Sequence, residues 1–193
     1  MISRATLSGV VAGQQKFRSM LAGNSAYIPT SYESIASVSP SGTNTVTFSA
    51  ISSAFKTLQI RASFGDAAEN SLQMRFNGDA GTNYQSSSLE GNGTSVSGNA
   101  GYSENTMSIA FRGQGASTSA SYLAGAIIDI PNYSTSGIIK TCLSYFGVNQ
   151  NTTGKMGFSE GVWFDTSAIT SITITMAANY SSGTVFSLYG IRG

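Results

Sequence analysis

The nine carboxylates are the residues of this 193-residue chain with the best chance of carrying acid–base chemistry, because the chain has no histidine and a single cysteine. A glycosidase uses two carboxyl groups roughly 5–9.5 Å apart, one on each side of the scissile bond. Glu160 lies three residues before the single tryptophan, Trp163. The pair is a candidate for a sugar-binding or sugar-cleaving groove, in which an aromatic platform lies beside an acid. The interpretation that we favour places Trp163 in the core.

Other catalytic and metal-binding schemes lack their residue types. Serine and cysteine nucleophiles need an imidazole base, and zinc sites need several histidines or cysteines. Cys142 lies in a predicted strand, where we expect a buried apolar role. Asn77-Gly78-Asp79 offers oxygens to calcium but lacks the acid-rich calcium loop, so we interpret it as a turn. We therefore expect no catalytic residue, no cofactor and no metal, and a protein that is not an enzyme.

The composition is polar but almost uncharged. Serine, threonine, asparagine and glycine account for 86 residues, and 10% of the chain is charged, against about 25% in an ordinary soluble domain. A net charge of +1 gives no long-range field for nucleic acid. No apolar run approaches the ~18 residues of a membrane span, and the first residues lack the hydrophobic region of a signal peptide. We expect neither a nucleic-acid partner nor membrane insertion.

The N-terminal 30 residues differ from the rest of the chain. They contain three basic residues and no acid, whereas residues 33–193 contain seven basic and nine acidic residues. Apolar residues near helical spacing indicate a docking arm over residues 1–30 that orders against a partner: Leu7, Val10, Val11, Phe17, Met20 and Leu21. A frayed terminus is the alternative. A membrane-surface helix is less favoured, because the apolar stripe is weak and the bases are few.

Strand patterns begin at Tyr32. Apolar and polar residues alternate strictly in Thr57–Phe64, Ser71–Phe76 and Ser171–Met176, which indicates strands with one buried and one wet face. Weaker strand signals follow the same logic: Thr45–Ser49, Met107–Arg112, Ser121–Ile130, Ile138–Val148, Lys155–Trp163 and Thr184–Ile191. Nine or ten strands without a long helical pattern predict an all-β fold, an antiparallel β-sandwich or jelly roll, over residues 31–193 with an N-terminal extension.

The segments between the strands carry turn and loop residues. Ser86–Gly101 and Gly113–Ser119 are rich in serine and glycine, and we expect exposed loops there. Ile51–Phe55 and Asp165–Ile169 are expected to form single helical turns, the second capped by Asp165. Four tyrosines in or beside polar segments are candidates for exposed recognition residues: Tyr84, Tyr102, Tyr122 and Tyr133.

Several ordered motifs of this chain resemble structural proteins of marine and freshwater tailed bacteriophages. The first is Arg75–Tyr84, which fits the pattern R-F-N-x-D-x-G-x-N-Y of that family. The others are Phe48-x-x-Ile51 leading to Leu58–Arg61, Ile130–Tyr133 before Lys140-Thr141, Trp163 before Ala168–Ile172, and the closing Phe186–Ile191. The resemblance covers residues 27–193.

The resemblance implies a β-sandwich or jelly-roll module on the particle surface and no catalytic residues. We expect a non-enzymatic virion protein, a surface-exposed tail or fibre-type appendage that docks through its arm on capsid or tail proteins. The protein is expected to form a homo-oligomer, most simply a trimer, whose closed symmetry protects its edge strands. The alternatives are a capsid (head) decoration or cement protein and a carbohydrate-binding module for host adsorption, which would contact a surface glycan.

Overall fold

A computed structural model describes residues 31–66, 70–110, 122–149 and 154–192, and the expected docking arm lies outside these residues. The described part of the chain is built from β-strands and contains no helix. Its strands are β1 (Tyr32–Val38), β2 (Thr45–Phe48), β3 (Thr57–Phe64), β4 (Leu72–Phe76), β5 (Tyr84–Gly91), β6 (Val96–Glu104), β7 (Met107–Ala110), β8 (Ala124–Pro131), β9 (Lys140–Asn149), β10 (Gly154–Trp163), β11 (Ile172–Thr175) and β12 (Val185–Ile191).

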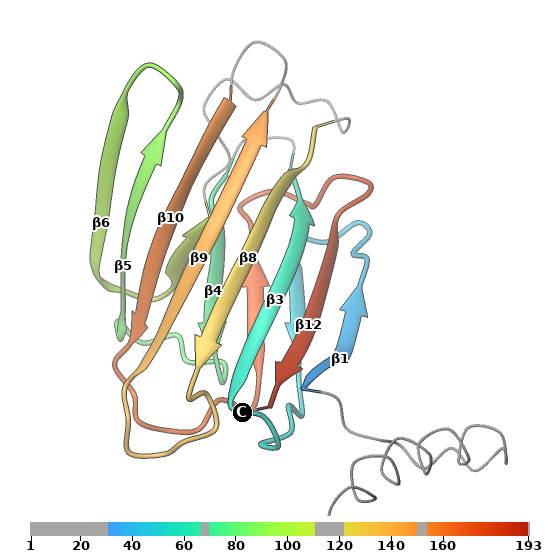
Figure 1. Ribbon diagram of the computed structural model, residues 1–193, viewed down its shortest axis with the longest axis vertical. Coiled ribbons are helices and arrows are strands. Elements are labelled where there is room, and N and C mark those ends of the chain that lie inside the picture. Colours follow the sequence, from blue (N-terminus) through green and yellow to red (C-terminus); the bar gives the residue numbers. More distant parts are fainter. Residues whose placement is uncertain (1–30, 67–69, 111–121, 150–153, 193) are drawn as a thin grey trace, which may run out of the picture. The chain divides into compact units, whose positions relative to one another are not determined.

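The strands form two antiparallel sheets of unequal size. The larger has the order β1-β12-β3-β8-β9-β10-β5-β6, and the smaller has the order β2-β11-β4-β7. Figure 1 shows the larger sheet in front, from β6 at the left to β1 at the right, and the smaller sheet behind it. We call the face of the larger sheet that looks away from the smaller sheet the outer face, and the opposite face the inner face. The predicted antiparallel β-sandwich is confirmed.

The alternation of residue types explains how each strand is oriented. In β3, Leu58 and Ile60 are fully buried on the inner face, whereas Arg61 lies on the outer face. Complete burial of one such aliphatic side chain contributes about 1.5–3 kcal/mol. The same period of two operates in β8 and β12, which flank β3 in register. The inner faces of both sheets therefore meet in one apolar core.

Ser86–Gly101 does not form the exposed loop that its sequence predicts. The expected loop is an antiparallel hairpin of β5 and β6, in which Ser88 pairs with Asn99 and Gly91 with Val96. The turn lies where Asn92-Gly93 predicts one: Asn92 Oδ1 accepts hydrogen bonds from the backbone N–H groups of Thr94 (3.0 Å) and Ser95 (2.8 Å). Glycine and asparagine have low strand propensity, so the pairing of β5 with β10 and of β6 with β5 decides the structure of this segment.

The two expected helical turns are also wrong. No helical residue occurs in Ile51–Phe55 or in Asp165–Ile169. Backbone groups of both segments bond to distant parts of the chain instead. The N–H of Ile51 donates to the carbonyl of Thr170 (3.0 Å), and that of Ile169 donates to the carbonyl of Tyr133 (2.7 Å). The Asp165 side chain accepts from the N–H of Ser167 (2.6 Å), which forms an Asx turn instead of a helix cap.

Two glycines in the larger sheet give a matched test of the packing. A Cβ at Gly190 would lie 2.4 Å from the ring of Phe55, whereas a Cβ at Gly125 would meet no atom within 4 Å. We expect Gly190→Ala to lower the free energy of unfolding by about 2 kcal/mol through overpacking. Gly125→Ala should leave it within about 0.5 kcal/mol. Urea unfolding followed by tryptophan fluorescence measures both, and equal effects would contradict this packing.

Candidate functional site

The predicted pair of Glu160 and Trp163 does not form a groove. The two residues lie on opposite faces of β10, because their separation of three residues is an odd number in a strand. Trp163 is buried, stacks with Tyr84 at a centroid distance of 6.4 Å and meets Phe76 edge-on at 5.6 Å. Glu160 is exposed on the outer face. The favoured interpretation of Trp163 as a core residue is therefore confirmed.

Asp79 shows why the Asn77-Gly78-Asp79 turn has this sequence. Asn77 and Gly78 have φ values of 53° and 70°, and the N–H of Asp79 donates to the carbonyl of Phe76 (2.9 Å), as in a type I′ turn. The Asp79 carboxylate then accepts from Trp163 Nε1 (2.7 Å), Asn83 Nδ2 (2.9 Å) and the N–H of Gly81 (2.8 Å). Its oxygens hold the turn and the core indole together, as the interpretation of the motif as a turn requires.

Asn77 connects the same turn to the chain before β11. Its Oδ1 accepts from the backbone N–H groups of Thr170 (2.8 Å) and Ser171 (3.2 Å), and its Nδ2 donates to the carbonyl of Ala168 (2.8 Å). The motif residues Asn77, Asp79 and Trp163 are therefore structural: they join β4, β10 and β11.

The tyrosine candidates separate into buried and exposed residues. Tyr84 and Tyr133 are fully buried, so their expected exposure is wrong. The Tyr84 hydroxyl donates to the carbonyl of Asp79 (3.2 Å), and the Tyr133 hydroxyl donates to the carbonyl of Ser52. Each ring fills the core and uses its hydroxyl to tie down a loop. Tyr102, on edge strand β6, is 71% exposed, and Tyr122 is partly exposed. They lie outside the surface described below.

The buried ionisable groups also have structural partners. Lys140 Nζ donates to the carbonyls of Thr135 (2.7 Å) and Ile138, and its pKa is lowered by desolvation. Glu90 forms an ion pair with Lys155 (2.8 Å) and accepts from Asn99 Nδ2 (3.0 Å). In the described part of the chain, no three His, Cys, Asp or Glu residues are grouped so that they could hold a metal ion.

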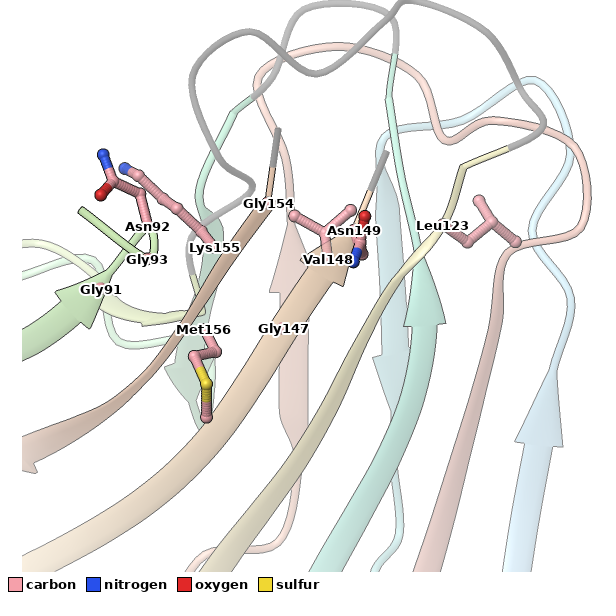
Figure 2. Close-up of a pocket in the computed structure, with 10 residues that line it drawn as sticks. All are labelled: Gly91, Asn92, Gly93, Leu123, Gly147, Val148, Asn149, Gly154, Lys155 and Met156. Atoms are coloured by element: carbon pink, nitrogen blue, oxygen red, sulfur yellow. The ribbon is translucent and has the colours of Figure 1, made fainter. Parts of the chain in front are cut away.

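A hollow of about 610 Å³ lies where β9 and β10 approach the upper end of the larger sheet in Figure 1. Figure 2 shows Asn92 and Lys155 on one side of the hollow, Leu123 at the other side and Met156 pointing along the sheet. The side chains do not converge on one point, and Lys155 is already paired with Glu90. We assign no site to this hollow.

The outer face of the larger sheet carries the most unusual surface of the described residues. One cross-strand row runs through directly paired positions, from Leu89 on β5 to Phe158 on β10, Tyr145 on β9 and Ile127 on β8. Leu143 and Met156 lie in the two neighbouring rows. We call these six side chains the apolar patch; all are between 40% and 72% exposed. Apolar residues in contiguous exposed rows are typical of interaction surfaces.

Tyr145 separates two shallow hollows on this face. One, of about 450 Å³, lies towards β10 and β5 and is lined by Phe158, Leu89, Glu160 and Ser87 among others. The other, of about 490 Å³, lies towards β8 and β3 and has Gly125, Gly147, Ile127 and Arg61 in its lining. The two glycines lie in the row of Met156 and leave room beside the Tyr145 ring. The patch therefore combines a ridge with a hollow on each side.

Polar groups border the patch. Next to Leu143, in its own row, lie Glu160 on β10 and Asp129 on β8. Asp129 accepts a hydrogen bond from Gln59 Nε2 (2.8 Å), and Gln59 Oε1 accepts from Tyr32 (2.6 Å). Arg61, opposite Ile127, lies 5.5 Å from the ring centre of Tyr32. These side chains connect β8, β3 and β1 on the outer face.

The sequence of β9 contains a signal for the apolar patch. In Thr141–Val148, Leu143 lies beside Cys142 and Tyr145 lies beside Phe146, so apolar residues fall on both faces of the strand. Such a pattern is typical of strands that are covered on both faces. In β10 the usual arrangement of apolar residues inside and polar residues outside is reversed. Met156 and Phe158 point outwards, whereas Gly157 and Ser159 occupy the positions that face the core. The ring of Phe146 occupies the space beside Gly157 that a side chain would otherwise fill.

No protein-family model, no curated protein and no solved structure matches this chain. No helix in the described residues has the length and apolar character needed to cross a bilayer. The apolar patch is therefore interpreted from its own geometry.

Asp79 makes the stability of the sandwich fall at low pH. Hydrogen bonds from Asn83, Trp163 and Gly81 lower the pKa of this carboxyl below its ordinary value of 3.8. Its contribution to stability is complete above that ordinary value and is lost as the pH falls through the lower pKa of the folded state. We expect Asp79→Ala to cost about 2 kcal/mol at pH 7.

Asp79→Asn should keep the hydrogen bond from Trp163. It should remove the part of the pH dependence of stability that comes from the Asp79 carboxyl. Thermal unfolding of both variants between pH 2 and 7 measures the two effects. An Asp79→Asn protein that loses stability in acid as steeply as the unchanged protein would contradict the assigned role of Asp79.

The thiol of Cys142 should be unreactive in the folded protein. The thiol is buried beside Met107 Sδ (3.3 Å), and burial raises its pKa to about 12. The thiolate, which is the nucleophile, is therefore scarce and shielded. We expect no reaction with a disulfide reagent at pH 8 in the native state and one thiol per chain after denaturation. Rapid reaction of the native protein would contradict the burial of this strand.

Proposed function

We propose that the protein is a non-enzymatic structural component of a tailed bacteriophage particle, a surface-exposed tail or fibre-type appendage that docks through residues 1–30. The observation that carries this proposal is the apolar patch, an exposed set of aliphatic and aromatic side chains on a sheet face. Such a surface is stabilised when protein covers it.

The roles of the resembling motifs support the same proposal. Asn77, Asp79 and Trp163 hold the turn and the core together, which suits a family whose motifs are architectural. The low charge of the chain lets many copies lie side by side without strong fields between them. A capsid decoration protein would use the same features, so the position on the particle is decided by experiment.

A carbohydrate-binding role for host adsorption is the second candidate. It is favoured by the hollow beside Tyr145, in which the Phe158 ring lies near Ser87 and Glu160; these two are joined by a hydrogen bond of 3.1 Å. Aromatic rings beside hydroxyl and carboxylate groups suit sugars, but the aliphatic Leu89 and Leu143 in the same hollow suit protein better. Binding of host polysaccharide that Phe158→Ala abolishes would favour this second role.

Immunogold labelling of purified particles tests the proposed function. We expect gold particles on tails or fibres and a fixed number of copies per particle by quantitative mass spectrometry. Label on the heads would identify a decoration protein instead. The absence of the protein from purified particles would contradict both.

Deletion of residues 1–26 tests the docking arm. We expect the truncated protein to remain soluble and to unfold cooperatively, because the sandwich core is formed by residues after Tyr32. It should fail to join particles, since the apolar residues of the arm would supply the contact with capsid or tail. The full-length protein is the control, supplied from the same plasmid. Normal incorporation of the truncated protein would contradict the docking arm.

A further inference from the structure

We propose that the apolar patch is the contact surface for a second copy of this chain, with the outer faces of the two larger sheets packed against each other. This inference rests on the proposed assembly function and names the partner of the patch. The contact is two-fold symmetric, unlike the trimer expected from the sequence. Its axis lies midway between the two sheets, parallel to the strands and level with the gap between β8 and β9.

The size of the patch fits a protein partner. With 40% to 72% of each residue exposed, the six residues present on the order of 600 Å², which equals the largest apolar patches on monomeric proteins. A stable interface buries about 800 Å² on each partner. The polar border of Ser87, Glu160 and Asp129 supplies the remaining area. The patch thus has the apolar centre and polar rim of a protein interface.

The arrangement of the row makes the face complementary to itself. A two-fold axis between β8 and β9 exchanges these strands, so Tyr145 of each copy lies over Ile127 of the other. Tyr145 then meets the hollow that is lined by Ile127, Gly125 and Gly147. Each copy supplies both the ridge and the hollow, and the contact closes after two copies.

Charges on the two sides of the axis agree with this arrangement. Glu160 lies one strand beyond β9, on β10, and Arg61 lies one strand beyond β8, on β3. The axis therefore brings Glu160 of one copy over the β3 strand of the other, where Arg61 stands in the adjacent row. Sheets that pack face to face are about 10 Å apart, which two long side chains can span. The pair occurs twice in the dimer.

The mass of the full-length protein in solution tests the inference. Sedimentation velocity at 1–50 µM chain should give a species of twice the chain mass of 20.0 kDa. Tyr145→Lys places a charge in the centre of the contact on both copies, and we expect the dimer to weaken by roughly 100-fold or more. Ile138→Lys is the matched control: Ile138 is 47% exposed but lies outside the patch, in the loop before β9. This control should remain dimeric.

A charge exchange tests the position of the axis. Glu160→Arg should weaken the dimer by roughly 10-fold, because it brings two arginines together at each end of the contact. The double change Glu160→Arg with Arg61→Glu should restore most of the affinity. Circular dichroism and thermal unfolding show which variants keep the fold, and Tyr145→Phe, which keeps the ring, should remain dimeric even if Tyr145→Lys unfolds.

The outcomes separate this inference from the proposed function. A monomer at 50 µM, a species of three chain masses, or a dimer that is indifferent to both Tyr145→Lys and Glu160→Arg would overturn the two-fold contact. None of these results affects the labelling of particles, which tests the structural role. Conversely, a dimer in solution together with absence from particles would uphold the contact and reject the proposed phage function.

Discussion

The junction between Asp79 and Trp163 is the interaction on which the rest of the sandwich depends. Asp79 follows β4 of the smaller sheet, and Trp163 ends β10 of the larger sheet. Their hydrogen bond therefore ties the two layers together at one end of the fold. Trp163 also packs on Tyr84 and Phe76. The polar contact with Asp79 therefore holds the indole ring against the other core aromatics.

Much of the fold could be predicted from the sequence because most strands are wet on one face. The period of two in Thr57–Phe64 is visible in the residues themselves and corresponds to β3. The same reasoning failed for Ser86–Gly101, where serine and glycine fill a hairpin that long-range pairing stabilises. It failed for Ile51–Phe55 as well, since the backbone of that segment bonds to the distant residues Thr170 and Tyr133. Local propensity carries no information about such partners.

The apolar patch could not be predicted from the sequence for a related reason. The interpretation of Trp163 as a core residue was correct, but the residue types of β9 could not say which side of that strand faces the core. Cys142 and Phe146 are buried, whereas Leu143 and Tyr145 are exposed, and all four are apolar. Only the position of the smaller sheet, with β7 packed on β9 and β10, distinguishes the covered side from the open side. The apolar residues of β9 and β10 on the open side form the apolar patch.

The edge strand β6 has a consequence for how the molecule opens. Its nine residues pair only with β5 and are largely exposed, so they contribute little to the apolar core. Amide protons of a strand held in this way exchange through local fraying, at a small fraction of the global unfolding free energy. Those of β3 and β12, which lie between other strands and carry buried side chains, exchange only when the whole sandwich unfolds. The larger sheet is therefore graded in stability from β3 and β12 towards its β6 margin.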